Sequence, residues 1–255
     1  MLSVTPTLQA TSFEPEPQTI VPKAKPRGGF WWTLGWFVIA GLTGAACVAA
    51  FIAFEEAWSE LSSRQISADI CRSIEEIASV SAMIFVLIVA ARRVGWSVRD
   101  GLGLVWPHRR YILIGLVLFV GNVLFEFALD DILPEPEETP AFVKEFRAAS
   151  GHPISLALLW VSTVIIAPIW EEIACRGFLL RGWIASPLGV AGAIVLTSLL
   201  FAVAHLQFNA HAMVSLFVSG FLLGVMRWIS GSLVPSMLMH AAWNTMVMIM
   251  LMLDA

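Results

Sequence analysis

The chain has 255 residues, of which 58% are hydrophobic and only 13% charged, and its mean hydropathy is +0.81. This apolar surface is too large to hide inside one soluble core, so a water-soluble globular protein is excluded. The formal net charge of −4 argues against a polyanion-binding surface, and nucleic acid is excluded as a partner. The cysteines Cys47, Cys71 and Cys175 have the spacing of neither a disulfide framework nor a thiolate metal site.

Residues 1–29 are rich in Pro, Thr, Ser, Gln, Glu and Lys and show no apolar periodicity, which predicts a disordered leader. The basic residues Lys23, Lys25 and Arg27 precede an apolar stretch of full spanning length. We therefore expect the first helix to remain as a membrane anchor and not to be removed as a signal peptide.

Apolar segments long enough to cross ~30 Å of hydrocarbon recur along the rest of the chain. Because lipid cannot satisfy backbone polar groups, we predict an all-α fold, a polytopic transmembrane helical bundle of about seven to eight spans. The seven segments that we identify lie near 30–54, 73–91, 111–129, 154–180, 188–206, 212–229 and 232–253. The segment 154–180 is long and carries charge, so a break or an extra half-helix is expected there.

The basic residues indicate an orientation. With the N-terminus inside, eleven Lys and Arg residues fall in inner segments and four in outer segments. The positive-inside rule therefore predicts a multi-pass protein of the plasma (inner) membrane with a cytoplasmic N-terminus.

Ionisable side chains inside apolar runs are the most informative residues. Each costs ~2.5–3.5 kcal/mol at the centre of a membrane helix on insertion scales, unless it faces protein, water or a partner. Three groups of polar and aromatic residues occur in successive segments: Glu171, Glu172 and Arg176, then Phe201 and His205, then His240 and Asn244.

The spacing within the first group separates two roles. Glu172 and Arg176 are four residues apart and lie about 40° from each other on a helix, which favours an ion pair. Glu171 points about 100° away from Glu172, so we expect it to be the carboxylate that is free to act. Pro168 is expected to bend the helix just before the acidic pair and to open a water-filled pocket.

Helix depth tests whether the three groups can meet. From the expected inner ends, at ~1.5 Å per residue, Glu171 and His240 reach similar depths. His205 would lie about 12 Å too far out, unless its helix tilts, starts later than residue 188 or enters as a broken segment.

A buried carboxylate and two imidazoles provide a general base, a proton carrier and a donor for a developing oxyanion, which favours hydrolysis. Asn244 adds an amide that could hold a carbonyl oxygen. Two alternatives remain. The same residues could form the proton relay of a proton-coupled transporter, or they could be structural in a non-catalytic immunity or scaffold protein.

The motifs EEIACR at 171–176, FAVAH at 201–205 and HAAWN at 240–244 resemble, in order and spacing, those of the CAAX-protease and bacteriocin-processing (CPBP, Abi) family of intramembrane proteases. The resemblance covers roughly residues 154–250. It implies an endopeptidase acting on a peptide or a membrane-associated protein, including lipidated proteins. Glu171 would activate water alongside His205, and His240 and Asn244 would bind the oxyanion. The side chains expected to support the site are Glu172, Arg176 and Phe201.

The resemblance also divides the chain, into the leader at 1–29, N-terminal transmembrane helices and loops at 30–150, and a catalytic transmembrane region at 151–255. It leaves two catalytic types open, a glutamate-activated water without metal and a zinc ion held by Glu171, His205 and His240. The first motif lacks the His-Glu-x-x-His pair that places two zinc ligands on one helix, so we expect no metal and no other cofactor.

Overall fold

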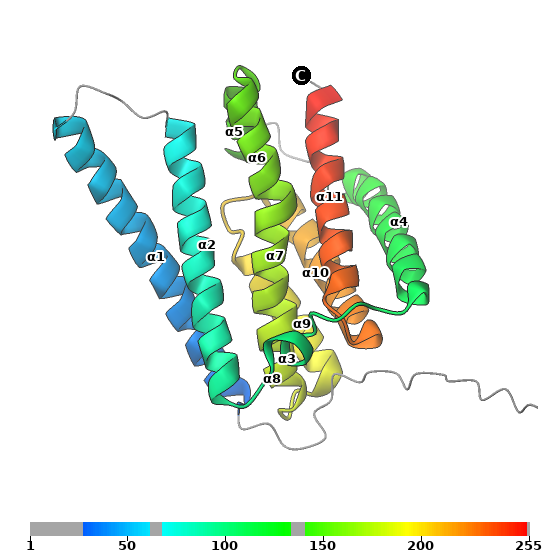
Figure 1. The fold of residues 1–255 in the computed structure, drawn as a ribbon. Coiled ribbons are helices and arrows are strands. Elements are labelled where there is room, and N and C mark those ends of the chain that lie inside the picture. Colours follow the sequence, from blue (N-terminus) through cyan, green and yellow to red (C-terminus); the bar gives the residue numbers. More distant parts are fainter. Residues whose placement is uncertain (1–27, 62–67, 134–140, 254–255) are drawn as a thin grey trace, which may run out of the picture.

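The computed structural model describes residues 28–61, 68–133 and 141–253, and every regular element within these ranges is helical (Figure 1). Six of the helices are long and apolar enough to cross a membrane. The predicted all-α polytopic bundle is therefore confirmed. The predicted leader at 1–29 lies almost entirely outside the described residues.

The six candidate spans are the helices α1 (Phe30–Leu61), α2 (Ala68–Arg93), α4 (Arg109–Ile132), the continuous helix Pro153–Ile184, α10 (Ala210–Ser230) and α11 (Val234–Leu253). The prediction of a seventh full span at 188–206 is wrong. The helix found there, α9 (Gly189–Val203), has 15 residues. At ~1.5 Å per residue it is about 22 Å long, which is too short for ~30 Å of hydrocarbon.

Large apolar side chains are exposed along the middle of the outer helices. Leu42 on α1, Phe85 on α2 and Val117 on α4 are 66%, 65% and 70% exposed, respectively. Such surfaces are unfavourable in water and ordinary against lipid tails. Together with the six apolar helices, they identify a multi-pass membrane protein.

The long helix Pro153–Ile184 is continuous, so the break or extra half-helix expected in this segment does not occur. Its successive parts are α6 (Pro153–Val161), η1 (Ser162–Ile166), α7 (Ala167–Glu172), η2 (Ile173–Leu179) and α8 (Leu180–Ile184). The two η segments are π turns, which are wider than α-helical turns. In η1 the amide of Ala167 donates to the carbonyl of Ser162, five residues back. The irregularity expected at Pro168 thus takes the form of a widened turn directly before it.

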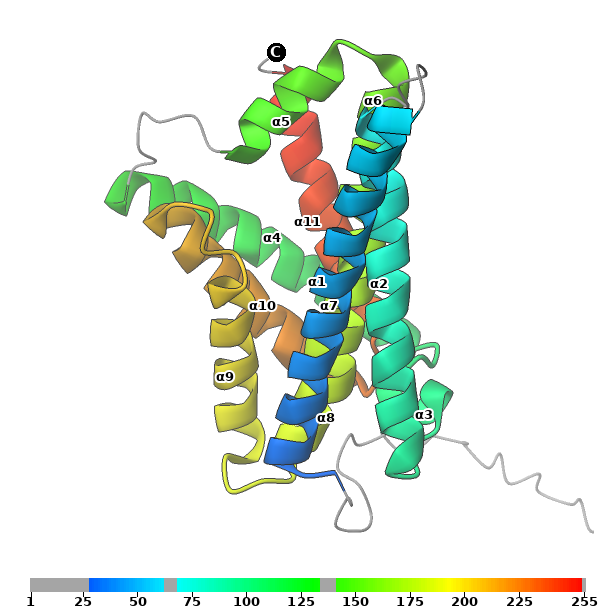
Figure 2. The ribbon, with the colours of Figure 1, turned by 90° about the vertical axis from the view of Figure 1, so that its left-hand side faces the viewer.

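The bundle has two apolar clusters, one on each side of the long helix. The α1–α2 pair packs against η2, α8 and α9 around Leu87, Phe178 and Trp183. On the other side, α4, α10 and α11 meet around Leu223, Met226 and Met239. Figure 2 shows α4, α10 and α9 on one side of the bundle and α1 and α2 on the other.

A short connection holds the beginning of α11. After the small helix α3 (Val98–Leu102), Gly103 adopts a left-handed conformation with φ +82°, and its carbonyl accepts a hydrogen bond from the amide of Leu233 at 2.7 Å. The hydroxyl of Ser232 donates to the carbonyl of Val105 and accepts from the amide of Val234. These hydrogen bonds therefore fix where α11 starts, and so where His240 lies along the bundle axis.

Gly182 allows α1 to approach α8 closely, because a Cβ added there would lie 2.4 Å from Cγ2 of Thr33. We expect Gly182→Ala to cost about 1–3 kcal/mol of unfolding free energy, the usual range for overpacking. Thermal denaturation of the purified protein in detergent measures this loss. Gly41→Ala on α1, where nothing lies within 4 Å of an added Cβ, is the control and should not lower the melting temperature. Equal melting temperatures for Gly182→Ala and the unchanged protein would contradict the prediction.

Candidate active site

A cavity of about 310 Å³ brings the three sequence groups together. The four residues predicted to be catalytic, Glu171, His205, His240 and Asn244, all line it, and so does Phe201. Its walls come from α4, α5 (Ala141–Ser150), η1, α7, the end of α9 and the turn after it, α10 and α11. Its volume lies at the lower end of the range for small-ligand pockets, ~300–1,000 Å³.

Glu171 is the carboxylate that faces this cavity. His205 Nε2 lies 3.9 Å from Glu171 Oε1, and His240 Nε2 lies 3.5 Å from Glu171 Oε2. Each carboxylate oxygen therefore has an imidazole beside it. The side chain of Glu171 is 19% exposed, whereas that of Glu172 is fully buried. The two acids thus point in different directions, as their angular spacing predicted.

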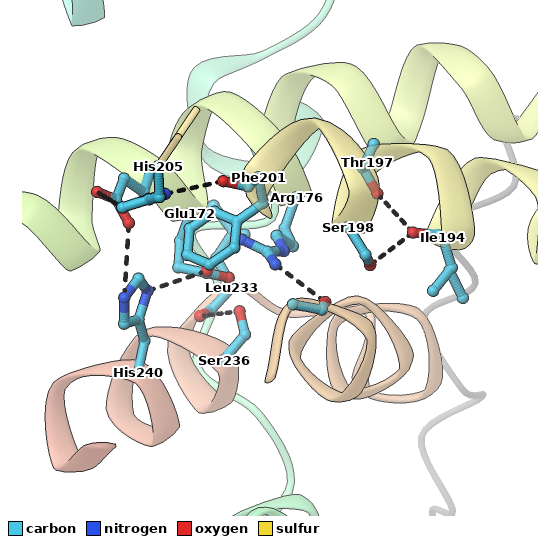
Figure 3. Close-up of polar contacts among 12 residues, drawn as sticks. Glu172, Arg176, Ile194, Thr197, Ser198, Phe201, His205, Leu233, Ser236 and His240 are labelled. Atoms are coloured by element: carbon cyan, nitrogen blue, oxygen red, sulfur yellow. Dashed lines mark hydrogen bonds and ion pairs between the residues drawn. The ribbon is translucent and has the colours of Figure 1, made fainter. Parts of the chain in front are cut away.

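Glu172 and Arg176 form the expected ion pair, with 2.8 Å between Glu172 Oε1 and Arg176 Nη1 and no exposure of either side chain. Arg176 also donates from Nη2 to the carbonyl of Gly220 on α10 at 2.9 Å (Figure 3). Its guanidinium lies over the ring of Phe201, 4.7 Å from the centroid. The cation is therefore held by a carboxylate, a carbonyl and an aromatic ring from three different elements.

His240 connects the two acids. Its Nδ1 lies 3.3 Å from Glu172 Oε1, and its Nε2 faces Glu171. The ring meets Phe201 edge to face, with 5.7 Å between centroids. The imidazole therefore occupies a defined position between the buried ion pair and the acid at the cavity wall.

His205 has a defined tautomer when neutral. Its Nδ1 lies 2.8 Å from the carbonyl oxygen of Phe201. Because a carbonyl only accepts, Nδ1 carries the hydrogen and donates it. In the neutral ring Nε2 then presents its lone pair on the side of Glu171. The ring of Phe208 stacks on the imidazole of His205, with 5.9 Å between the ring centroids.

The expected mismatch in the depth of His205 came from wrong helix boundaries. The long helix continues to Ile184, four residues beyond the expected end at 180. Glu171 therefore lies farther from the C-terminal end of this helix than expected. The helix α9 begins at Gly189 and ends at Val203, so His205 lies in the turn that follows it. The imidazole reaches the cavity from this non-helical segment.

Asn244 binds the widened turn of the long helix. Its Nδ2 donates to the carbonyl of Thr163 at 2.7 Å. In a π turn each amide bonds to the carbonyl five residues back, as Ala167 does to Ser162. The carbonyl of Thr163 would next pair with the amide of residue 168, but this residue is Pro168 and has no N–H. The Asn244 amide therefore satisfies a carbonyl that the backbone leaves unpaired. Its second amide hydrogen is still available to the cavity that Asn244 lines.

Polar pairs between α4 and α10 were not recognised from the sequence. Asn122 Nδ2 donates to Ser219 Oγ at 2.7 Å, and both residues line the cavity. The available signal was the recurrence of polar residues every four positions on both helices. Two further pairs continue the same antiparallel register, the hydroxyl of Ser215 with Glu126 and the imidazole of His211 with Asp130.

Within the ranges that the structure describes, no group of three or more His, Cys, Asp or Glu residues is arranged to hold a metal ion. Glu171 and His205 both have side-chain atoms that can accept a hydrogen bond from a water molecule in the cavity.

Residues 153–246 match the family model of the type II CAAX prenyl endopeptidase Rce1-like proteins. Neither the curated proteins nor the solved structures compared with the chain gave a match. The matched segment runs from the start of α6 into α11 and contains every residue of the three sequence groups. It confirms the resemblance to the CPBP intramembrane proteases and supports a CAAX-type intramembrane endopeptidase activity in general.

The buried ion pair predicts a large effect on stability. Arg176→Met leaves the carboxylate of Glu172 without its cation, and we expect a loss of about 3–5 kcal/mol of unfolding free energy. Adding Glu172→Gln removes the unpaired charge and should recover part of the loss. Thermal denaturation in detergent compares the three proteins. A double variant that is no more stable than Arg176→Met would contradict this explanation.

The contact between Asn244 and Thr163 predicts a coupling with Pro168. Asn244→Ala leaves a partly buried carbonyl without its protein partner, so it should cost about 1 kcal/mol. Pro168→Ala restores a backbone N–H, so the same Asn244→Ala change should cost less in that background. A double-mutant cycle of unfolding free energies in detergent measures the coupling. Strictly additive losses would show that the two residues act independently.

Proposed function

We propose that the protein is an intramembrane endopeptidase in which Glu171 activates a water molecule for attack on a peptide bond. The substrate is a peptide or a membrane-associated protein, including lipidated proteins. One observation carries the proposal: in the Rce1-like segment, a cavity-facing carboxylate has an imidazole beside each of its oxygens. This is the arrangement that general acid–base catalysis requires within a protected site.

The first step is the attack of water on the scissile carbonyl. Glu171 takes a proton from the water, and the oxygen forms a bond to the carbonyl carbon. His205 helps to orient the water, because its Nδ1 is committed to the Phe201 carbonyl and its Nε2 accepts on the side of Glu171. The tetrahedral intermediate then loses the amine as the C–N bond breaks, and Glu171 returns the proton to this leaving nitrogen.

The negative charge on the oxygen of the intermediate needs donors. We assign one donor to His240, whose Nε2 lies on the side of Glu171 at the cavity, so that an Nε2–H can donate to this oxygen. The second amide hydrogen of Asn244 is the other proposed donor. Glu172, Arg176 and Phe201 support this set, since Glu172 and Phe201 contact His240 and Arg176 in turn holds both of them.

No metal or other cofactor is part of the proposal. The support is the donor set, in which the Glu-Glu-x-x-x-Arg motif contributes one carboxylate to the cavity, that of Glu171, and no second ligand of the zinc-binding helical type. We further infer the plasma (inner) membrane with a cytoplasmic N-terminus. The support here is the excess of basic residues on one side, including Arg92 and Arg93 in the last turn of α2.

The central test is Glu171→Gln, which keeps the size of the side chain and removes the base. We expect kcat to fall by about 10²–10⁴-fold, the range typical of a lost general base. The assay uses the purified full chain in detergent and an internally quenched peptide ending in a prenylated Cys-aliphatic-aliphatic-X sequence. Glu126→Gln, a change of another carboxylate within a span that does not line the cavity, is the matched control. Cleavage retained in Glu171→Gln would overturn the assigned role.

The same assay tests the metal-free mechanism. Prolonged treatment with a zinc chelator such as 1,10-phenanthroline should leave the cleavage rate unchanged, because no step uses a metal ion. A non-chelating isomer of the same compound controls for inhibition by the aromatic rings. Activity that is lost on chelation and recovered with added Zn²⁺ would contradict the metal-free mechanism while leaving the protease assignment intact.

A further inference from the structure

Asn122 is a cavity residue with an unused hydrogen-bond acceptor. It lies in the middle of α4, it is only 5% exposed, and it lines the same cavity as Glu171. Within the described ranges, its Oδ1 has no hydrogen-bond partner. A buried acceptor without a partner is unfavourable, so such groups in native proteins usually have a structural or functional explanation.

The orientation of the Asn122 amide is fixed by its neighbour. Nδ2 donates to the hydroxyl of Ser219 at 2.7 Å, and Ser219 is itself buried at the cavity wall. This bond directs the donor side of the amide to α10 and leaves the acceptor side for another group. Ser219 adjoins Gly220, whose carbonyl binds Arg176. The position of Asn122 is therefore connected through α10 to the buried ion pair.

Two neighbouring polar pairs on α4 and α10 lie in the same register as the Asn122–Ser219 pair. Glu126 with Ser215 and Asp130 with His211 repeat the contact at the next turns of both helices, in one antiparallel register. The three pairs show how α4 is rotated against α10, and in this rotation Asn122 is the member of its helix series that lines the cavity. Since α4 precedes the matched segment 153–246, this wall of the cavity comes from outside the Rce1-like region.

We propose that Asn122 is a substrate-binding residue whose Oδ1 accepts a hydrogen bond from a backbone N–H of the bound peptide. This inference rests on the proposed function. A peptide that enters a cavity with walls such as Phe119, Leu216 and Leu222 loses water from its amides, and each buried N–H needs an acceptor. Asn122 supplies that acceptor without a charge that would compete with Glu171. It therefore aligns the peptide backbone before the attack of water.

The direct test removes the proposed donor from the peptide. The prenylated Cys-aliphatic-aliphatic-X peptide is prepared in versions in which one backbone N–H at a time is replaced by an ester oxygen. Binding to the full-length Glu171→Gln protein in detergent is measured by fluorescence anisotropy, so that turnover does not interfere. We expect one ester position to raise Kd about three- to tenfold, the cost of one neutral hydrogen bond. In Asn122→Leu the unmodified peptide should bind more weakly by a similar factor, and that ester should have no further effect.

A matched pair of serine variants separates substrate binding from helix packing. Ser219→Ala releases the Asn122 amide and should raise Kd, whereas Ser215→Ala removes the equivalent contact one turn away, outside the cavity, and should not. In the active protein, the Asn122 and Ser219 variants should raise KM with little change in kcat. Since Ser219→Ala retains Asn122 itself, the test does not depend on the folding of a single variant.

Several outcomes would overturn the inference. Equal effects of Ser219→Ala and Ser215→Ala would mean that the pairs only hold the helices together. Ester effects that are the same with and without Asn122 would mean that Asn122 does not contact the peptide backbone. A protein that binds the peptide through Asn122 but never cleaves it would count against the proposed function and not against this site. Absence of peptide binding to the Glu171→Gln protein would overturn this assignment of Asn122.

Discussion

The burial of one ion pair within the membrane-spanning bundle constrains the rest of the structure. Glu172 and Arg176 have no exposure, and charges at this depth are tolerated only when protein groups replace water. The replacement groups come from several helices: the Gly220 carbonyl from α10, the Phe201 ring from α9 and the His240 imidazole from α11. Satisfying the pair therefore assembles the wall from which Glu171 faces the cavity. Stability and the geometry of the site depend on the same contacts.

The part of the site that follows from helical periodicity could be predicted from the sequence. Residues four positions apart share a helix face, which places Glu172 with Arg176, and the angular offset of Glu171 directs it elsewhere. These relations are local, so they hold wherever the helix lies in the bundle. Charges within apolar runs are also rare enough to mark the three groups without knowledge of the packing. The helical class of the fold follows similarly from the length of the apolar segments.

Features that depend on contacts between helices could not be predicted in this way. The entry of His205 from a turn depends on where α9 ends, and Ala204 and Leu206 extend the apolar segment past the last helical residue, Val203. The Asn244 contact depends on a π turn that leaves the Thr163 carbonyl unpaired, which the position of Pro168 alone does not reveal. The Asn122–Ser219 pair depends on the rotation of α4 against α10. Each helix carries the polar spacing, but only packing shows that the two patterns coincide.

The short length of α9 has a consequence for the surrounding lipid. A helix about 22 Å long cannot match ~30 Å of hydrocarbon, and membranes adapt to such short elements by becoming locally thinner. The non-helical residues 204–208 follow at the cavity, where exposed backbone is tolerated only against protein or water. We therefore expect the bilayer to be locally thinner beside α9. A polypeptide that diffused laterally to this place would leave the hydrocarbon sooner than elsewhere in the bilayer and would meet water there.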